Sequence, residues 1–193
     1  HATIQPVDEA LVDWQPIIKL VEQHDGVLGA APYIEEGVWL QGVGSSGAKI
    51  RGIDPAYEEH VSEVGSKMVT GAVADLRPGE YSIILGIGLA AQLRVGPGDR
   101  VTVIAPRLKA TPVGASPLMR RFTVVGAFEF GEYENDNTLA LIHIDDAARL
   151  LRMQPGSIGG IRLKLADMDL SWRTAREISS ELTGQYIVRD WTE

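Results

Sequence analysis

The sequence contains no cysteine and no long apolar run, and each absence excludes a class of protein. Without cysteine the chain can form no disulfide framework, thiolate metal site or thiol nucleophile. No stretch approaches the roughly 20 consecutive apolar residues that cross a bilayer, and no charged-then-apolar signal pattern opens the chain. We therefore expect either a soluble protein or an extramembrane piece of a larger one.

Side chains that could bind metal or act as a catalytic base are few and scattered. The histidines lie at positions 1, 24, 60 and 143, and no two have the spacing of zinc or iron ligands. His143 follows an apolar strand and is expected to be satisfied by its neighbours or half-exposed. Serines are plentiful, but no Gly-x-Ser-x-Gly elbow is present. These patterns predict a non-catalytic domain without a cofactor, and a periplasmic hydrolase is the alternative from another class.

Two further motifs have both a functional and a structural interpretation. Gly86 and Gly88 stand between an expected strand and a short helix, as in a dinucleotide-binding turn, but Ala91 replaces the third glycine. Tight packing of the turn is the better interpretation. The acidic stretch 129–137 offers oxygens that calcium could use, but it lacks the Asp-x-Asp-x-Asp-Gly order of a calcium loop. We expect a solvated surface loop there.

The composition is that of a globular protein with a substantial core. The chain has 193 residues, of which 45% are hydrophobic, and this length allows one or two domains. Its net charge of −8 argues against general binding to nucleic acid or to anionic membranes, because both require a broad cationic surface.

One segment, Arg94–Gly126, carries the opposite charge from the rest of the chain. It holds six cationic side chains against a single carboxylate, which is a local net charge of +5. Within it, strand-like runs at 100–105 and 119–126 flank a loop from Pro106 to Pro117 that contains three prolines. Compact domains rarely keep so long a loop unless it is disordered or functional. Because prolines reduce the entropy lost on docking, we predict a binding arm that is presented to a partner.

The arm also contains apolar residues that we expect to be exposed beside the arginines. These residues are Leu108, Val113 and Leu118. Apolar groups surrounded by arginine are typical of a protein-binding surface. The alternative is that the arginines merely solubilise the loop.

Strands and helices alternate at both ends of the chain, whereas the centre is mostly strands. Helices are expected at 14–23, with Asp13 as N-cap, and at 86–93, 145–151 and 170–182; strands are expected at 27–33, 37–43, 48–53, 81–85, 100–105, 119–126, 138–142, 158–165 and 185–189. Residues 54–77 give a weak signal and are expected to be loop with one short helix. This order predicts an α+β architecture in which a β-rich subdomain is inserted into an α/β one.

Motifs along nearly the whole chain match the pattern of one known family. They include Leu76–Gly86 (LRPGEYSIILG), Thr111–Gly114 (TPVG), the run from Arg120 to Phe128, Gly159–Ile161 and Asp190–Trp191. In these residues the sequence resembles the LolC/LolE family, the membrane subunits of the lipoprotein-releasing ABC transporter of Gram-negative bacteria.

The resemblance implies a fold and a location. It implies a periplasmic domain of an inner-membrane protein, related to that of the MacB-like transporters. A Porter-like α/β subdomain would comprise residues 1–55 and 127–193. A β-rich Sabre-like subdomain would comprise residues 56–126 and carry a protruding β-hairpin arm at 106–117.

The resemblance also implies partners for that arm. In LolC-type subunits a hairpin called the Hook enters the periplasmic chaperone LolA, and a basic and polar pad assists it. The implied partner-binding residues here are Arg100, Pro106, Leu108, Thr111, Pro112, Val113, Gly114, Pro117, Met119 and Arg120. Met119 stands where the pad has a glutamine. The other implied partners are a second membrane subunit, a cytosolic ATPase subunit and lipoprotein cargo; the alternative role is that of a LolE-like cargo-contacting or MacB-like efflux subunit.

Overall fold

Strand β2 (Val27–Gln41) belongs to two parts of the fold and joins them. The structure is a computed structural model that describes residues 2–7, 10–112, 114–167, 176–178, 180, 182 and 186–189, without the side chains of 108–111 and 189. The first half of β2 pairs with β9 (Gly160–Leu165), and its second half pairs with β3 (Ser45–Ile53). The sequence predicts two strands at 27–33 and 37–43, but one continuous strand is present.

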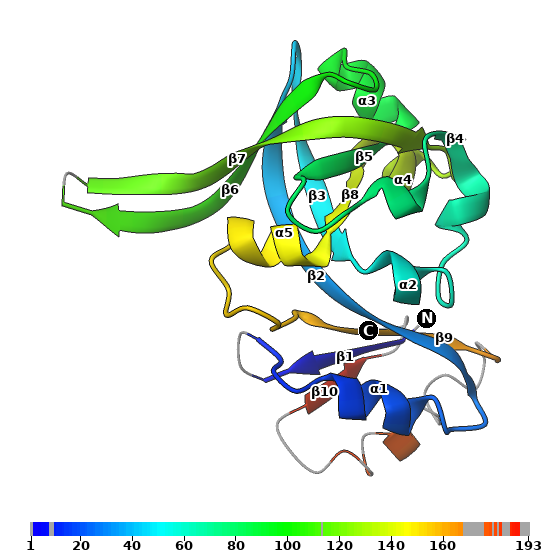
Figure 1. Ribbon diagram of the computed structural model, residues 1–193. Coiled ribbons are helices and arrows are strands. Elements are labelled where there is room, and N and C mark those ends of the chain that lie inside the picture. The colour runs from blue at the N-terminus through cyan, green and yellow to red at the C-terminus, as the bar shows by residue number, and fades with distance from the viewer. Residues whose placement is uncertain are drawn as a thin grey trace.

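The remaining elements follow in chain order around β2 (Figure 1). They are β1 (Ala2–Pro6), α1 (Gln15–Val21), α2 (Pro55–Glu58), the 3₁₀ helices at Val64–Lys67 and Val73–Asp75, β4 (Met68–Thr70), β5 (Ser82–Gly86), α3 (Ile87–Leu93), β6 (Arg100–Thr111), β7 (Gly114–Phe128), α4 (Tyr133–Thr138), β8 (Leu139–His143), α5 (Ile144–Leu150) and β10 (Tyr186–Arg189). The predicted α+β class is confirmed.

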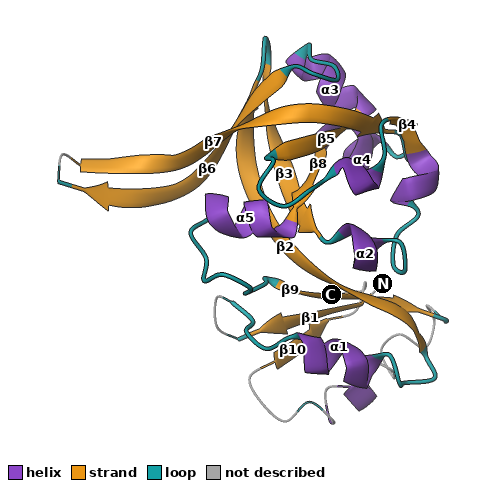
Figure 2. Cartoon of the chain, viewed as in Figure 1, coloured by secondary structure: helices purple, strands orange, loops and turns teal. Residues whose placement is uncertain are grey.

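Six strands close into a barrel. The order is β2, β3, β8, β5, β7 and β6, and β6 returns to β2 through Thr102–Ile104. β3 runs parallel to β8 and β5 runs parallel to β7, whereas the other neighbours are antiparallel. Figure 2 shows the short helices arranged around these strands. Strands from within and from outside residues 56–126 therefore share one barrel.

Strands β5 and β8 are buried along their whole length, and all but Ser82 and His143 of their side-chain-bearing residues are apolar, because both of their faces are covered. Ile83 and Leu85 face the main core, whereas Ile84 packs into a second cluster with Phe128 and Leu141. The segment between β3 and β5 provides that cover through Val64 and Leu76. This segment was predicted to be mostly loop, and in the structure it forms α2, two 3₁₀ helices and the short strand β4.

A second layer contains the first and the last of the described strands. β10, β1 and β9 continue the sheet from the first half of β2, and β1 and β10 lie side by side in it (Figure 1). Helix α1 contributes Ile17, Ile18 and Val21 to the core. Asp13 is not its N-cap, because the helix begins one residue later than predicted and Trp14 takes that position.

Only part of the structure predicted for the C-terminal residues falls within the described part of the chain. Most of the helix expected at 170–182 lies outside the described residues, although Ile178 and Leu182 are buried in the main core. The expected last strand is confirmed as β10, at Tyr186–Arg189. Within the described part of the chain, no helix is long and apolar enough to cross a bilayer.

Candidate functional site

Strands β6 and β7 continue beyond the barrel as a two-stranded ribbon (Figure 1). They pair with each other from Arg100↔Thr123 to Thr111↔Gly114. β2 pairs with β6 only at Thr102–Ile104, and β5 pairs with β7 only at 123–128. Among the described strands, the distal ribbon therefore pairs only with itself.

The proline pattern predicted a loop from Pro106 to Pro117, and this prediction is wrong because most of these residues lie in paired strands. Both strands extend to the tip and leave residues 112 and 113 between them. Proline lacks an N–H group and so disfavours a central strand, but the edge of a ribbon tolerates it. A register shift between Ala105 and Leu108 accommodates Pro106. The segment is a paired hairpin that stands out from the barrel.

The residues expected to bind a partner occupy this ribbon and its base. Pro117 is half-buried. The exposed residues of this set are Arg100, Pro106, Pro112, Gly114, Met119 and Arg120. Leu108 and Thr111 lie in β6, but their side chains and all of Val113 lie outside the described part. Leu118, expected to be exposed, is only 8% exposed. It lies on the same face of β7 as Phe122, and that face points into the core.

The two predicted pad arginines lie on opposite faces of the ribbon. Val101, Val103 and Phe122 define the inner face because all three are buried. Arg120 pairs with Val103, so it belongs to this inner face. Arg100 precedes Val101 and projects from the outer face, since side chains alternate along a strand. The two cations do not form one flat patch.

On the inner face, Arg120 is held against an aromatic ring. Its guanidinium lies 3.8 Å from the centroid of the Tyr81 ring, and this ring packs edge-on against Phe122. The Tyr81 backbone has a φ of 51°, and its N–H donates to Oδ2 of Asp146 at 3.0 Å. Asp146 is fully buried and also accepts from the N–H of Gly79 at 2.7 Å. Arg120 is therefore positioned by a rigid support.

On the outer face, an apolar row crosses three strands. Trp39 of β2 pairs with Ile104 of β6, which pairs with Met119 of β7. Trp39 is 50% exposed and Met119 is 55% exposed. Trp39 was not predicted as a site residue. The signal in the sequence is the alternation: the apolar residues Val38 and Leu40 lie on one face of the strand, so Trp39 between them lies on the other. Arg121 and Thr102 form the adjacent row.

A polar cavity lies between the two layers of the fold. It has a volume of about 580 Å³, and its lining includes Tyr33, Glu35, Arg51 and Arg162. Burial alone would raise the pKa of the Glu35 carboxyl, but Arg51 and Lys49 outweigh it and set that pKa below its usual range. Burial raises the pKa of Tyr33, whose hydroxyl accepts a hydrogen bond from Gln5.

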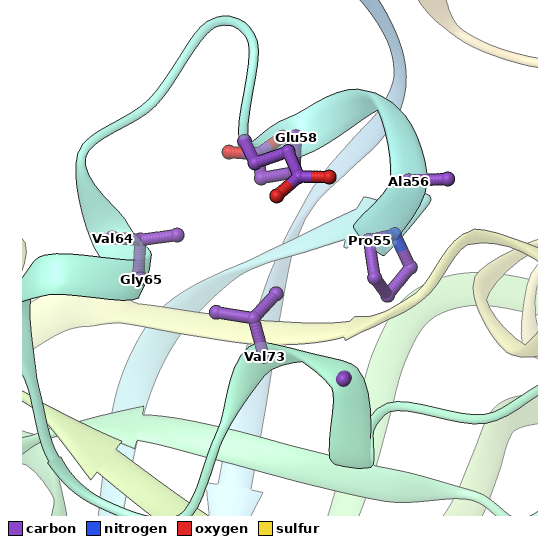
Figure 3. Close-up of a pocket in the computed structure, with 8 residues that line it drawn as sticks. Pro55, Ala56, Glu58, Val64, Gly65 and Val73 are labelled. Atoms are coloured by element: carbon purple, nitrogen blue, oxygen red, sulfur yellow. The ribbon is translucent and has the colours of Figure 1, made fainter.

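A smaller cavity, of about 290 Å³, lies between α2 and the two 3₁₀ helices (Figure 3). Pro55, Val64 and Val73 surround it, together with Glu58 and Glu59. Glu58 is bonded by Arg162 through both of its oxygens. Because Arg162 occupies both oxygens of Glu58, the two acids are not arranged as a general acid and base pair.

The glycines at the start of α3 serve close packing. A Cβ at Gly86 would lie 2.5 Å from the carbonyl oxygen of Asp136, and a Cβ at Gly88 would lie 2.3 Å from Oδ1 of Asn137. Helix α4 therefore fills the space in front of this turn, where a dinucleotide-binding turn would hold phosphate. The predicted packing role is confirmed.

The acidic stretch and His143 have structural partners. Residues 133–138 form α4, so the expected loop at 129–137 is partly helical. Asp136 is buried and accepts from the N–H groups of Phe130 and Gly131. His143 is buried and caps α5 by accepting from the N–H of Asp145 through Nδ1. Within the described residues, no cluster of three or more histidines and carboxylates could hold a metal ion.

The sequence matches one family over almost its whole length. The family described as MacB-like periplasmic core domain matches residues 2–181. The chain is 43% identical over 192 residues to the lipoprotein-releasing system transmembrane protein LolC of Xylella fastidiosa, and 43% identical over 194 residues to the LolC of Neisseria meningitidis. Each match covers 100% of this chain and 46% of the relative, so the chain spans about half the length of the relatives it matches.

Solved structures show the same fold at low sequence identity. The extracellular domain of the ABC-type transporter YknZ from Gram-positive bacteria superposes with a TM-score of 0.61 at 13% identity, covering 98% of this chain and all of that one. The periplasmic region of MacB from Actinobacillus actinomycetemcomitans gives 0.56 at 15% identity, covering 98% of this chain and 87% of that one. These values establish the fold alone. The resemblance to LolC noted in the sequence is confirmed by the sequence matches.

Proposed function

Since the chain belongs to the family of MacB-like periplasmic core domains, we propose that it is the periplasmic docking domain of a LolC-type subunit in a lipoprotein-releasing transporter. Its β6–β7 ribbon would enter a periplasmic chaperone of the LolA kind. ATP hydrolysis would take place on a separate cytosolic subunit, and the domain itself would be non-catalytic. The full-length protein would be anchored in the inner membrane beside a second membrane subunit.

The observation that carries this proposal is the free-standing ribbon. Among the described strands, the distal part of this hairpin pairs only with itself, so it contributes little to the stability of the barrel. Binding to a partner explains its length better. Pro106, Pro112 and Pro117 restrict its backbone and reduce the entropy lost on docking. Arg120 at its base is already ordered by Tyr81.

The outer apolar row supplies a second contact surface at the same base. Trp39, Ile104 and Met119 lie side by side, with Arg121 in the next row. Aromatic residues, methionine and arginine are enriched in the centres of protein interfaces. Met119 would therefore contribute apolar contact where a pad glutamine would contribute a hydrogen bond.

We also propose that the chain divides into two subdomains. Residues 1–55 and 127–193 would form the Porter-like part, and residues 56–126 the Sabre-like part. Because β3 and β8 of the first part complete the barrel, we expect residues 56–126 not to fold alone. A cooperative thermal transition of that fragment in isolation would contradict this expectation.

Calorimetric titration of this chain with the purified cognate chaperone tests the docking role. We expect Arg120→Glu to weaken binding by about 2–4 kcal/mol, as for central interface arginines. Replacement of residues 106–117 by a Gly-Ser linker should abolish binding. Lys19→Glu, on the exposed side of α1, has the same charge change and should bind as the wild type does.

The same titration separates the proposal from its runner-up. Unchanged affinity in both ribbon variants would refute chaperone docking through the ribbon. A chain that copurifies with lipoprotein and does not bind chaperone would instead favour the cargo-contacting role. The 26% identity over 160 residues to the LolE of Haemophilus influenzae supports this second role.

A further inference from the structure

A concave surface rich in arginine lies where the inner face of the ribbon meets helix α5. It has a volume of about 290 Å³, and we call it the arginine cleft; its lining includes Leu118, Arg120, Arg149, Leu150 and Arg152. Three of these residues are cations and none is acidic. On a chain with a net charge of −8, such a concentration of positive charge requires an explanation.

The cations come from two separate parts of the chain and are positioned independently. Arg120 stacks on Tyr81 from β7. Arg149, in the last turn of α5, donates from Nη1 to Oδ1 of the buried Asp146 at 3.2 Å. One of its five N–H groups is used in this contact, and the side chain remains 53% exposed. Arg152 is exposed just beyond the helix.

Asp146 connects the two sides of the cleft. Its carboxylate accepts from the N–H of Tyr81, whose ring supports Arg120, and from Nη1 of Arg149. One fully buried acid thus supports both guanidinium groups, Arg149 directly and Arg120 through Tyr81, while the Arg149 side chain stays 53% exposed. Cations that are ordered before binding lose less side-chain entropy when a ligand arrives.

The chemistry of the cleft selects a carboxylate next to an apolar group. Guanidinium forks match carboxylate geometry, while Leu118 and Leu150 form an apolar floor. We propose that the arginine cleft binds an acidic side chain, flanked by an apolar residue, on the protein that docks on the ribbon. This inference rests on the proposed function for its partner, and it assigns to Arg149 and Arg152 a binding role that the ribbon alone does not provide. Three cations are too few for nucleic acid.

Chaperone titrations at low and high salt give the first test. We expect Arg152→Glu to weaken binding by about fivefold to tenfold at low salt, with a smaller effect at high salt, because partly exposed charges are screened. Arg149→Gln should weaken binding in the same direction. Lys19→Glu and Lys19→Gln are the matched controls. If the ribbon replacement abolishes binding while both cleft variants match their controls, the cleft is refuted and the docking function stands.

A peptide probe tests the cleft without the chaperone. The capped peptide Ac-Leu-Glu-Leu-Glu-NH2 should shift the arginine Nε–Hε NMR signals of Arg120 and Arg149 at millimolar concentration, and Ac-Leu-Gln-Leu-Gln-NH2 should not. Arg152→Glu should abolish the shifts. Equal responses to the two peptides, or none to either, would overturn the proposal even if the chain bound no chaperone at all.

Discussion

The Arg162 guanidinium donates from Nη2 to both carboxylate oxygens of Glu58, at 2.6 and 2.5 Å. The two residues are 104 positions apart in sequence and join β9 to α2. Glu58 is 2% exposed, and Nε of Arg162 is buried with no hydrogen-bond partner among the described residues. The pair therefore connects the layer formed by β1, β9 and β10 to helix α2.

Removing one member of this pair should be strongly destabilising. Glu58→Gln leaves the Arg162 charge buried without its counter-ion, and we expect a loss of about 3–5 kcal/mol in the free energy of unfolding. Urea denaturation measures the change. Glu59→Gln, at the exposed neighbouring position, should cost less than about 0.5 kcal/mol. Equal stability of the two variants would show that the pair contributes little.

The Glu35 carboxyl should make stability depend on acid pH. Its pKa is lowered in the folded protein, so its contribution is present above the usual value of 4.5 and is lost as the pH falls through the folded pKa. We expect Glu35→Gln to be less stable than the wild type at neutral pH by under about 1 kcal/mol, because the group is partly exposed. The difference should disappear in strong acid. Urea midpoints at several pH values provide the measurement; a constant difference would contradict this assignment.

Replacing Asp146 should loosen the support of Tyr81. Asp146→Asn removes the buried charge that accepts from Gly79, Tyr81 and Arg149, and we expect a loss of about 2–3 kcal/mol. Asp145→Asn changes the same group at a half-exposed position and should have a much smaller effect. Thermal unfolding of the two variants decides the comparison. The prediction fails if Asp145→Asn is the more damaging change.

A methyl group at Gly86 should disturb the packing of α3 against α4. The new Cβ would approach the backbone of Asp136 to 2.5 Å, so we expect Gly86→Ala to cost about 1–3 kcal/mol. The control is Gly65→Ala, because among the described residues no atom beyond its chain neighbours lies within 4 Å of a Cβ at that site. It should be neutral or slightly stabilising. A tolerated alanine at Gly86 would mean that α4 can move away.

Local patterns in the sequence predicted most elements because burial there has a clear period. Helix α3 and strands β5 and β8 were expected almost at their observed positions, since Leu89, Leu93 and the apolar runs mark buried faces. Local signals failed in two places. The break expected between the strands at 27–33 and 37–43 falls on Ile34, Glu35 and Glu36, which lie inside the continuous strand β2. In the ribbon, Pro106 and Pro117 suggested a loop but lie within paired strands.

The arrangement of the candidate site depends on contacts that are distant in sequence. Closure of the barrel requires Trp39 to meet Ile104, and no short-range pattern specifies that pairing. The inward direction of Leu118 and Arg120 follows from the register with β6. Likewise, Arg149 approaches the ribbon only because α5 packs beside it. The family resemblance located the ribbon, but only the fold shows that its arginines face two directions.

A ribbon that leaves the barrel exposes two edges, and each edge is a template on which a second copy of the chain could add a strand. Pro106 and Pro117 deprive these edges of N–H donors, and the register shift after Ala105 bends one of them. Arg107 adds a positive charge at the same place, where it pairs with Glu36 at 3.0 Å. The prolines that made this segment look like a loop therefore protect the projecting hairpin against self-association into extended sheets.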